Sequence, residues 1–462
     1  MFRKVKKVHF VGIGGIGMSG IAELLLNLEF SVSGSDITDS EIIQSLRKKG
    51  ARIKMGHRAE NINNCEVLVY SSAVKETNPE LIAARNRGVP IIKRAQMLGE
   101  LIALKETSIA IGGTHGKTST SSMIGTVLSQ AGLDPTMVVG GLVRNIATNS
   151  RLGASELIVV EADEFDRSFL ALRPTIAIIT NIELEHTDCY QDLEDLYRAF
   201  AQFANSAPFY GAVIACLDSP GVQKIIQDIQ RPVITYGLSS QADFSAREIV
   251  CQETTTQFTY LQKHSPVGTV TLQVPGHHNV VNSLAAIALG TEMGLDPGSI
   301  LKGLKAYRGV RRRFEIKGLT REIMVVDDYA HHPTEVKATL AAAKAGWNRR
   351  IVAVFQPHLY TRTRDFYKAF AEAFMNSEVL VVTDVYPARE EPIEGVTGEL
   401  VANAARESGH KEVYYIEQLE ELTPLLDEIT QPNDMVITLG AGTIWRYGQA
   451  YFDHLQAKED EN

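Results

Sequence analysis

The sequence predicts an α/β protein with three domains. Short apolar runs typical of buried strands alternate with stretches of helical periodicity, a pattern that predicts parallel sheets. Glycine-rich turns occur at two predicted strand-to-helix junctions, and 462 residues are more than one domain usually holds. We expect a Rossmann-like domain over residues 1–105, a central domain with a phosphate-binding P-loop over 106–310, and a Rossmann-like α/β domain over 311–462.

The composition is that of a globular protein with a large core. It is 44% hydrophobic and 22% charged, and the net charge of -9 argues against a nucleic-acid partner. No apolar run reaches the length of about 18 residues that a membrane span needs. The four cysteines form no C-x-x-C pair, which fits a reducing compartment, and we predict a cytoplasmic protein.

The first glycine turn, Gly12-Ile-Gly-Gly-Ile-Gly17, fits the G-x-G-x-x-G fingerprint. Residues 8–13 predict a strand, 18–28 a helix, and 30–36 a second strand that ends in Asp36. An acid at this distance from the glycines is typical of a ribose partner. Ser71 and Ser72 follow another predicted strand, at the edge where parallel sheets bind ligands. Together these features predict a site for a dinucleotide or another nucleotide.

The second glycine turn, Gly113-Thr-His-Gly-Lys-Thr118, predicts a phosphate-binding loop between a strand and a helix over residues 119–130. Glycines let backbone N–H groups approach phosphate oxygens. Lys117 can reach the outer phosphates, and Thr118 offers a hydroxyl to Mg²⁺. The longer form of the pattern needs glycine where Ile111 stands, so G-x-x-G-K-T is the better match. The alternative is an ordinary glycine turn before a helix that happens to contain Lys-Thr.

Acidic residues follow two later strands of the central domain. Glu161 ends the strand predicted over 157–161, and a second apolar strand is followed by Glu183, Glu185, His186 and Asp188. A carboxylate beside Thr118 would complete an Mg²⁺ site. The alternative, that acids cap the next helix, fits Asp188, Asp192 and Glu194 better than Glu161. His186 by itself fits a metal ligand and a structural histidine equally well.

His278 and Asn282 are four residues apart on a predicted helix, so they share a face and could contact a nucleotide base. The alternative is that Asn279 caps this helix, and the spacing alone does not separate the two.

The third domain has strand-like runs at 323–326, 351–355, 379–383 and 435–439, with helices between them such as 335–344 and 365–375. This alternation predicts a parallel sheet. Polar side chains gather where the strands end, namely Asp327, Asp328, Tyr329, His331, His332, Gln356, His358, Tyr360, Arg362, Asp384, Tyr386 and Arg389.

These motifs together resemble the Mur ligases, ATP-dependent amide ligases of peptidoglycan precursor synthesis. The resemblance rests, in the family's order, on G-x-x-G-K-T, Glu161-Ala-Asp-Glu164, Thr180-Asn-Ile182, His186, His278-Asn279-x-x-Asn282, Arg313-Phe-Glu315 and Asp328-Tyr-Ala-His-His-Pro333. Residues 12–20, 355–358 and 384–390 are similar to the branch that joins L-alanine to the lactyl carboxylate of UDP-N-acetylmuramate. The alternative is the branch that recycles murein tripeptide, which carries Cys-Gly-Thr in place of Gly15-Ile16-Gly17.

The resemblance implies ATP and Mg²⁺ as cofactors and UDP-N-acetylmuramate and L-alanine as substrates, and we expect a monomer or weak homo-oligomer. The implied UDP-substrate site comprises Gly12, Gly14, Gly15, Gly17, Asp36, Ser71 and Ser72. The implied ATP site comprises Gly113, Thr114, His115, Gly116, Lys117, Thr118, Ser119, His278, Asn282 and Arg313. The implied metal ligands are Thr118, Glu161 and His186; the residues around L-alanine are Tyr329, His358 and Arg362; and the catalytic residues are Lys117, Arg313 and His186.

Three features depart from the family pattern. Residues 188–211 contain no lysine, so the carbamylated lysine of several relatives has no counterpart. Ala330 stands where relatives often have glycine, and Leu359 where they have a basic residue. We therefore expect Arg362 to bind the alanine carboxylate without a second arginine. The base that takes the amine proton is left open among His186, His331 and His358.

Two functions of other classes fit parts of the sequence. An NAD(P)-dependent oxidoreductase with an NTPase module fits the first glycine turn and Asp36, and an ATP-switched interaction protein fits the second turn. Neither function needs His358, Arg362 and Asp384 at strand ends, so the ligase is favoured over both.

Overall fold

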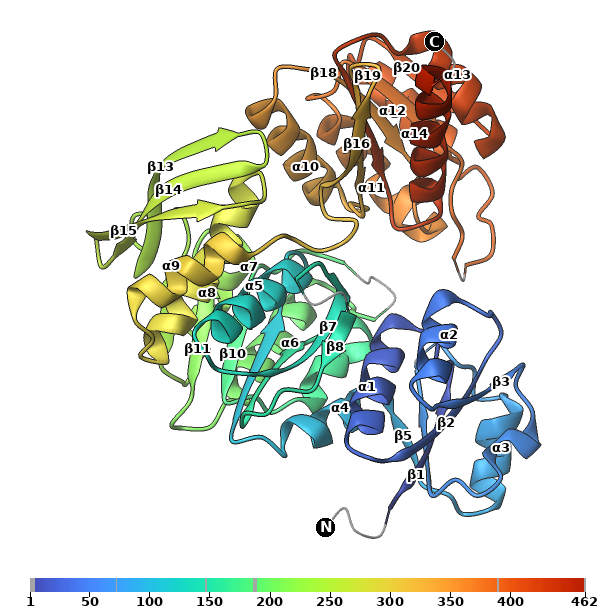
Figure 1. Cartoon of the computed structure of the whole chain (residues 1–462), viewed down its shortest axis with the longest axis vertical. Coiled ribbons are helices and arrows are strands. Elements are labelled where there is room, and N and C mark those ends of the chain that lie inside the picture. The colour runs from blue at the N-terminus through green and yellow to red at the C-terminus, as the bar shows by residue number, and fades with distance from the viewer. Residues whose placement is uncertain (1–4, 72, 146–147, 186–188, 389, 461–462) are drawn as a thin grey trace. The chain divides into compact units, whose positions relative to one another are not determined.

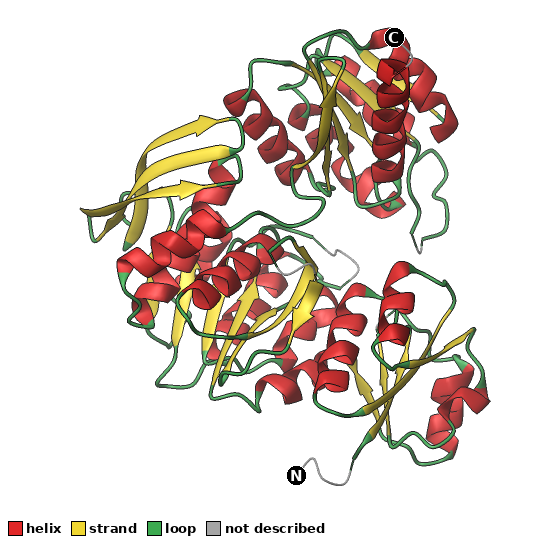
Figure 2. Cartoon of the chain, viewed as in Figure 1, coloured by secondary structure: helices red, strands yellow, loops and turns green. Residues whose placement is uncertain are grey.

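Largely parallel sheets, two of which include antiparallel strand pairs, carry helices on their faces, so the predicted α/β fold class is confirmed (Figure 1, Figure 2). The computed structural model describes residues 5–71, 73–145, 148–185, 189–388 and 390–460. The chain forms two units. The first comprises Met1–Arg247, Thr259–Val270 and Val281–Arg308, and the second Glu248–Phe258, Thr271–Val280 and Gly309–Asn462.

The N-terminal sheet is parallel, in the order β3-β2-β1-β4-β5. Its middle strand β1 carries buried apolar side chains such as Phe10 and Val11, and the chain leaves it through Gly12, whose φ of 77° favours glycine. The elements are β1 (Lys7–Val11), α1 (Ile16–Asn27), β2 (Ser31–Asp36), α2 (Glu41–Lys48), β3 (Arg52–Met55), η1 (Ala59–Ile62), β4 (Val67–Tyr70), α3 (Pro79–Asn86), β5 (Ile91–Lys93) and α4 (Arg94–Ile102).

The central sheet has the order β15-β14-β13-β12-β11-β10-β6-β9-β7-β8. Strand β6 runs parallel to its neighbours β9 and β10, so the carboxyl ends of these three strands share one edge, where ligands of such sheets bind. The elements up to β12 are β6 (Thr107–Gly112), α5 (Lys117–Gln130), β7 (Thr136–Val143), β8 (Thr148–Arg151), β9 (Leu157–Glu161), η2 (Phe165–Ala171), β10 (Ile176–Ile179), α6 (Leu193–Asn205), β11 (Ala212–Cys216), α7 (Pro220–Ile226) and β12 (Val233–Tyr236).

Three further strands extend this sheet, and the sequence analysis did not predict them. They are β13 (Phe244–Gln252), β14 (Thr255–Gln262) and β15 (Ser265–Leu272), joined by two-residue turns and followed by α8 (His277–Glu292) and α9 (Pro297–Ala306). Both residues of the second turn, Lys263 and His264, have positive φ, as tight hairpins require.

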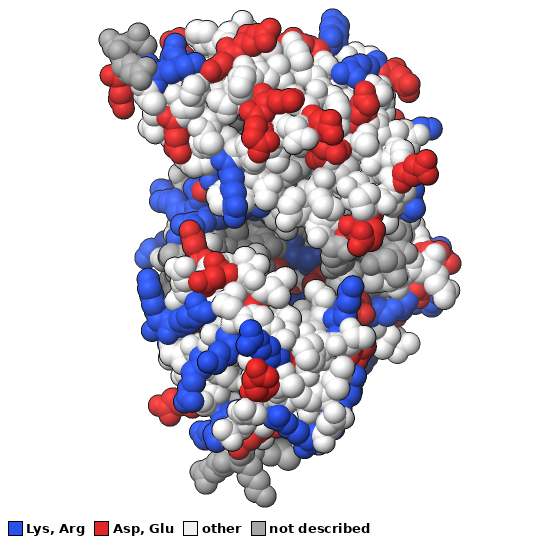
Figure 3. Space-filling model, turned by 90° about the vertical axis from the view of Figure 1, so that its right-hand side faces the viewer, with Lys and Arg blue, Asp and Glu red and all other residues white. Residues whose placement is uncertain are grey.

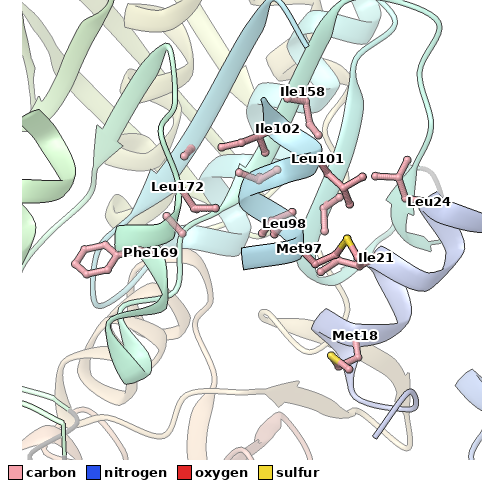
Figure 4. Close-up of a cluster of buried hydrophobic side chains, with 14 of the residues drawn as sticks. Met18, Ile21, Leu24, Met97, Leu98, Leu101, Ile102, Ile158, Phe169 and Leu172 are labelled. Carbon is pink, nitrogen blue, oxygen red and sulfur yellow. The ribbon is translucent and has the colours of Figure 1, made fainter. Parts of the chain in front are cut away.

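Helices α1 and α4 of the N-terminal domain are buried against the central domain. Figure 4 shows Met18, Ile21 and Leu24 of α1 near Met97 and Leu101 of α4, with Ile158, Phe169 and Leu172 in the same cluster of buried side chains. A side chain at Gly20 would contact Val138 of β7 and Ser150 of β8. The two domains of the first unit therefore share one hydrophobic core.

The sheet of the third domain has the order β16-β17-β21-β18-β19-β20. Strand β16 runs antiparallel to β17, so the prediction of a parallel sheet is wrong for this edge strand and right for the other pairs. Side chains alternate between faces: Ala353 and Phe355 pack with α10, α11 and α12, whereas Val352 and Val354 pack with α13 and α14. The elements are β16 (Glu315–Thr320), β17 (Ile323–Asp328), α10 (Pro333–Gly346), β18 (Arg350–Phe355), α11 (Tyr360–Ala373), β19 (Val379–Thr383), α12 (Gly398–Glu407), β20 (Val413–Ile416), η3 (Leu419–Glu421), α13 (Leu422–Ile429), β21 (Asp434–Leu439) and α14 (Ile444–Asp460).

Four helices begin earlier than predicted. Helix α1 begins at Ile16, α5 at Lys117, α10 at Pro333 and α11 at Tyr360. Lys117 and Thr118 consequently lie in the first turn of α5, where backbone N–H groups lack helical partners.

The surface carries charges of both signs, and basic and acidic side chains are both spread over the face drawn in Figure 3. Within the described ranges, no helix has the length and apolar character to cross a membrane.

Candidate active site

The phosphate loop between β6 and α5 is held by the segment that follows β10. Gly113 and Gly116 have φ values of 135° and 82°, which favour glycine. The N–H of His115 donates to Oδ1 of Asn181 at 2.8 Å, and the Thr180 hydroxyl donates to the His115 carbonyl at 2.6 Å. Thr180 and Asn181 thus set the loop's shape, a role that the sequence analysis did not assign to them.

Lys117 forms a buried ion pair beside this loop. Its Nζ lies 2.7 Å from Oε2 and 3.0 Å from Oε1 of Glu164, and it donates to the carbonyl of Gly113 at 2.6 Å. The side chains of Lys117 and Glu164 are 17% and 2% exposed. The sequence analysis quoted Glu164 in the acidic motif after β9 but proposed no role for it.

Burial and charge act in opposite directions on this pair. Burial alone would lower the pKa of Lys117, but the carboxylates of Glu164, Asp163 and Glu185 raise it above its ordinary value. Burial raises the pKa of Glu164 to about 7, and the nearby ammonium opposes that shift. Lys117 is therefore held as an ammonium, the form that binds phosphate.

Replacing Glu164 with glutamine is expected to lower the free energy of unfolding by about 1–3 kcal/mol, because the buried ammonium then loses the carboxylate that it contacts directly. The same change should tighten ADP binding, because phosphate oxygens no longer compete with a carboxylate for Lys117. Denaturant unfolding measures the first effect, and titration calorimetry with ADP measures the second.

A matched control for this change is Glu156→Gln. Glu156 is 57% exposed, and its carboxylate lies 3.7 Å from Nζ of Lys105, so its loss should change stability by less than about 1 kcal/mol. If Glu164→Gln behaves like this control in both measurements, Glu164 is not the resident partner of Lys117.

Thr118, in the first turn of α5, and Glu161, at the end of β9, carry oxygen atoms that can bind a metal ion. The Ser121 hydroxyl lies 3.1 Å from the Thr118 carbonyl and 3.4 Å from Oε1 of Glu161, so it links the carboxylate to the first helical turn. A side chain at Gly140 of β7 would overlap Oε2 of Glu161, so this glycine leaves room for the carboxylate. Hydroxyl and carboxylate oxygens are donors that Mg²⁺ prefers, and these residues fit that ion. The third predicted ligand, His186, lies outside the described residues.

Asp192 caps a helix, as the alternative for the acids of this region predicted. Its side chain accepts the Asp195 N–H at 2.8 Å and forms the N-cap of α6. Glu194 follows in the first turn of that helix, and Asp188 lies outside the described residues.

Helix α8 brings Asn282 to the phosphate loop. An added Cβ at Gly116 would lie 2.7 Å from Oδ1 of Asn282. Asn279 lies inside α8 and donates to the Pro275 carbonyl at 2.7 Å, so the alternative that it caps the helix is wrong. Nδ2 of Asn279 also lies 3.1 Å from Nε2 of the exposed His278. Contact of His278 and Asn282 with the base stays a prediction.

The first glycine turn faces Asp36 and Ser71. Oδ2 of Asp36 accepts the Gly14 N–H at 2.8 Å, and an added Cβ at Gly12 would lie 3.7 Å from the Ser71 hydroxyl. Gly15 is the N-cap of α1, and Gly17 is the second residue of that helix. Asp36 therefore accepts a hydrogen bond from the glycine turn itself, and its contact with a ribose stays a prediction. Ser72 lies outside the described residues.

His358 and Arg362 form a pair in the second unit. Nη1 of Arg362 donates to Nδ1 of His358 at 3.1 Å, and the His358 ring stacks on Tyr386 with centroids 5.8 Å apart. Arg362 is only 8% exposed, and Asp365 instead pairs with Arg364 at 2.7 Å. A surface role for Arg362 as the partner of Asp365 is therefore excluded.

Tyr329 and Arg313 lie near a histidine–glutamate pair in the same unit. The Arg313 guanidinium is 5.3 Å from the centroid of the Tyr329 ring and 3.5 Å from Oε1 of Glu335. Nδ1 of His331 is 3.2 Å from Oε2 of Glu335, and the rings of His331 and His358 are 6.0 Å apart. The second unit thus gathers Arg313, Tyr329, His358 and Arg362, whereas the phosphate loop belongs to the first.

The chain matches three family models in succession. They are described as Mur ligase family, catalytic domain, over residues 7–106; Mur ligase middle domain, over 111–290; and Mur ligase, glutamate ligase domain, over 312–442.

Relatives and solved structures agree with these matches. The chain is 49% identical over 456 residues to the UDP-N-acetylmuramate–L-alanine ligase of Geotalea uraniireducens, covering 99% of both chains. It is also 49% identical over 460 residues to the enzyme of that name from Syntrophus aciditrophicus, covering 100% of this chain and 96% of the relative. The crystal structure of UDP-N-acetylmuramate–alanine ligase from Thermotoga maritima superposes with a TM-score of 0.84 at 30% identity, covering 98% of this chain and 99% of that one. The chain therefore belongs to the Mur ligase family.

Proposed function

We propose that this family member joins L-alanine to the lactyl carboxylate of UDP-N-acetylmuramate and converts ATP to ADP and phosphate. The observation that carries the proposal is the 49% identity, over nearly the full chain, to proteins named as this ligase. The geometry supports it with a charged lysine in a phosphate loop and with the pair of the buried Arg362 and the half-buried His358 near the end of a strand.

The reaction must first activate a carboxylate. An oxygen of the lactyl carboxylate attacks the γ-phosphorus of ATP, the bond from that phosphorus to the β–γ bridging oxygen breaks, and ADP leaves. The alanine nitrogen then attacks the acyl carbon of the resulting acyl phosphate. The carbon–oxygen bond to the phosphate breaks, one amine proton is lost, and an amide remains.

The first unit supplies the groups for phosphoryl transfer. Lys117 exchanges the Glu164 carboxylate for phosphate oxygens and neutralises charge that develops on the transferred group. Thr118 and Glu161 would hold Mg²⁺, and the bound ion would neutralise charge on the phosphates. Contact of Arg313 with the ATP phosphates stays a prediction, based on the match between a guanidinium and phosphate oxygens.

The second unit supplies the groups for the amine. Arg362 binds the alanine carboxylate with His358 beside it, and the His331 ring lies next to those of His358 and Tyr329. Among the candidate bases, the hydrogen bonds favour His331. Its Nδ1 lies within 3.2 Å of two acceptors, the Tyr329 carbonyl and Oε2 of Glu335, so Nδ1 carries the proton and Nε2 has the basic lone pair. In His358, by contrast, Nδ1 is the acceptor for Arg362.

Phosphate release from ATP tests the proposal. The expected result is release that needs both UDP-N-acetylmuramate and L-alanine. If the tripeptide L-alanyl-γ-D-glutamyl-meso-diaminopimelate replaces L-alanine efficiently, the recycling reaction is the function instead. Release without either substrate would indicate an ATP-switched protein, and tight nicotinamide binding without release would indicate an oxidoreductase.

Replacing Arg362 with lysine is expected to raise the Michaelis constant for L-alanine about tenfold. Lysine keeps the charge but loses the paired planar donors that match a carboxylate. The constants for ATP and UDP-N-acetylmuramate should stay within about twofold, because those substrates bind to other domains. Steady-state kinetics with each substrate varied in turn measures all three.

Arg364→Lys is the matched control, because Arg364 lies on the same helix and its side chain is 52% exposed. It should leave all three constants unchanged. An equal rise in all three constants for Arg362→Lys would mean misfolding rather than lost alanine recognition, and no rise would remove Arg362 from the site.

A further inference from the structure

The turn that follows Glu164 contains two adjacent residues with a left-handed backbone. Asp166 has φ and ψ of 53° and 25°, and Arg167 has 53° and 24°. Residues other than glycine seldom adopt this conformation, and when they do they adopt it singly. Such strain persists only where the surrounding structure imposes it, and it is found preferentially at functional sites. The turn is therefore a candidate for a functional role.

Both ends of this turn are fixed. Before it, the carbonyl of Asp163 accepts the Ser168 hydroxyl at 2.8 Å and the Phe169 N–H at 2.9 Å. After it, the side chain of Phe169 is fully buried, and its ring packs on that of Phe200 with centroids 5.0 Å apart. The strain is therefore confined to the short segment between Asp163 and Phe169.

The turn also fixes Glu164, the partner of Lys117. The Glu164 carbonyl accepts the Arg167 N–H at 3.0 Å and the Tyr190 hydroxyl at 2.6 Å. The Arg167 guanidinium lies 4.9 Å from the centroid of the Tyr190 ring and pairs with Asp195 of α6. The left-handed residues therefore belong to the set of contacts that holds Glu164 against Lys117.

A phosphate that binds Lys117 takes away the counter-ion of Glu164. The Glu164 side chain is only 2% exposed, and Lys117 contacts both of its carboxylate oxygens. A buried carboxylate that has lost its counter-ion is strongly disfavoured. A movement of residues 164–167 would bring this carboxylate back toward water, and the same movement would relieve the strain at Asp166 and Arg167.

We propose that residues 164–167, here called the Glu164 turn, are a conformational switch. The turn is strained while Glu164 is paired with Lys117, it relaxes when phosphates replace Glu164 on Lys117, and the released strain adds to the affinity for nucleotide. This inference rests on the proposed function, because it takes ATP as the ligand of the phosphate loop. The competing role is static: the turn only connects β9 to Phe169, and its strain is the same whether or not Lys117 contacts Glu164.

The test is titration calorimetry of the full chain with ADP, comparing wild type with Asp166→Gly. Asp166 is exposed, and glycine adopts the left-handed conformation without a steric penalty. The substitution therefore removes strain from the conformation in which Glu164 holds Lys117, and less strain is left to release on binding. We expect ADP affinity to fall by about fivefold or more, while the thermal unfolding midpoint stays at least equal to that of Lys93→Ala.

Two substitutions are matched controls. Lys93→Ala removes the ion pair with Asp166, whose 3.1 Å contact joins side chains that are 49% and 39% exposed, and keeps the backbone of the turn. Lys263→Gly relieves the same backbone conformation in the hairpin between β14 and β15, where φ is 46°. Both variants should bind ADP with wild-type affinity.

A double variant separates the switch from a local change in flexibility. With Glu164→Gln, the side chain beside Lys117 is neutral and has no charge that must return to water. Asp166→Gly should therefore weaken ADP binding much less in the Glu164→Gln background than in wild type. An equal loss in the two backgrounds would mean that the turn acts without Glu164, and it would overturn the inference.

Two further results overturn it. ADP affinity in Asp166→Gly that equals or exceeds that of wild type leaves the static role. Equal losses in Asp166→Gly and Lys93→Ala assign the effect to the ion pair rather than to the backbone. If wild type does not bind ADP at all, the proposed function itself fails.

Discussion

Replacing Lys117 with alanine is expected to lower the rate of ligation by about a hundredfold or more. The ammonium is the positive charge that the first unit brings to the phosphates, and the carboxylates around it keep it protonated. A preorganised charge of this kind stabilises the transition state much more than it would in water. The rate of L-alanine-dependent phosphate release at saturating substrates measures the effect.

Lys105→Ala is the matched control for loss of an ammonium from the same domain. Nζ of Lys105 donates to the carbonyl of Ser155 at 2.6 Å, and the residue precedes β6, whereas the phosphate loop follows that strand. It should retain near-normal turnover. The assignment of the phosphate loop is wrong if Lys117→Ala ligates as fast as this control.

Replacing Glu161 with glutamine is expected to raise the Mg²⁺ concentration needed for half-maximal rate by about tenfold to a hundredfold. Loss of a residue that only supports a ligand typically costs that much in metal affinity, and a direct ligand should matter at least equally. Glutamine keeps the shape that fits beside Gly140, so packing changes little. The Michaelis constant for L-alanine should stay nearly constant. Titration of the rate with Mg²⁺ at fixed substrates measures the shift.

The variant Ser121→Ala distinguishes the loss of a metal ligand from the loss of a residue that only supports that ligand. The Ser121 hydroxyl lies 3.4 Å from the Glu161 carboxylate, which is long for a hydrogen bond, so its loss should raise the Mg²⁺ requirement by about tenfold at most, the lower end of the effect of a supporting residue. An unaltered Mg²⁺ titration for Glu161→Gln would refute the ligand role and leave the carboxylate as part of the packing around α5.

The phosphate loop could be predicted from sequence because its parts are adjacent in the chain. Glycines, Lys117 and the helix occupy one short stretch, and local geometry fixes their relation. The partner of Lys117 could not be predicted, because Glu164 is 47 residues away and only the pairing of β6 with β9 brings it near.

Two errors in the predicted starts of helices are explained by the residues at those starts. Helix α10 begins two residues early because Pro333 occupies its first turn and His332 is the N-cap, accepting the Thr334 N–H. Helix α11 begins after Leu359, whose φ of 71° is unusual for a branched side chain and leaves no signal in the sequence. The missed strands β13 to β15 carry many half-exposed polar residues, so their apolar alternation is weak.

The shared core of α1 and α4 has a consequence for the ancestry and engineering of this chain. Residues 1–105 produced alone would present the apolar faces of both helices to water, and such a surface favours aggregation. A nucleotide-sugar module grafted from a relative would likewise need complementary residues at Ile158, Phe169 and Leu172 of the recipient. The substrate of the first domain can therefore change by point substitutions around the glycine turn. Recombination would have to transfer the first and second domains together.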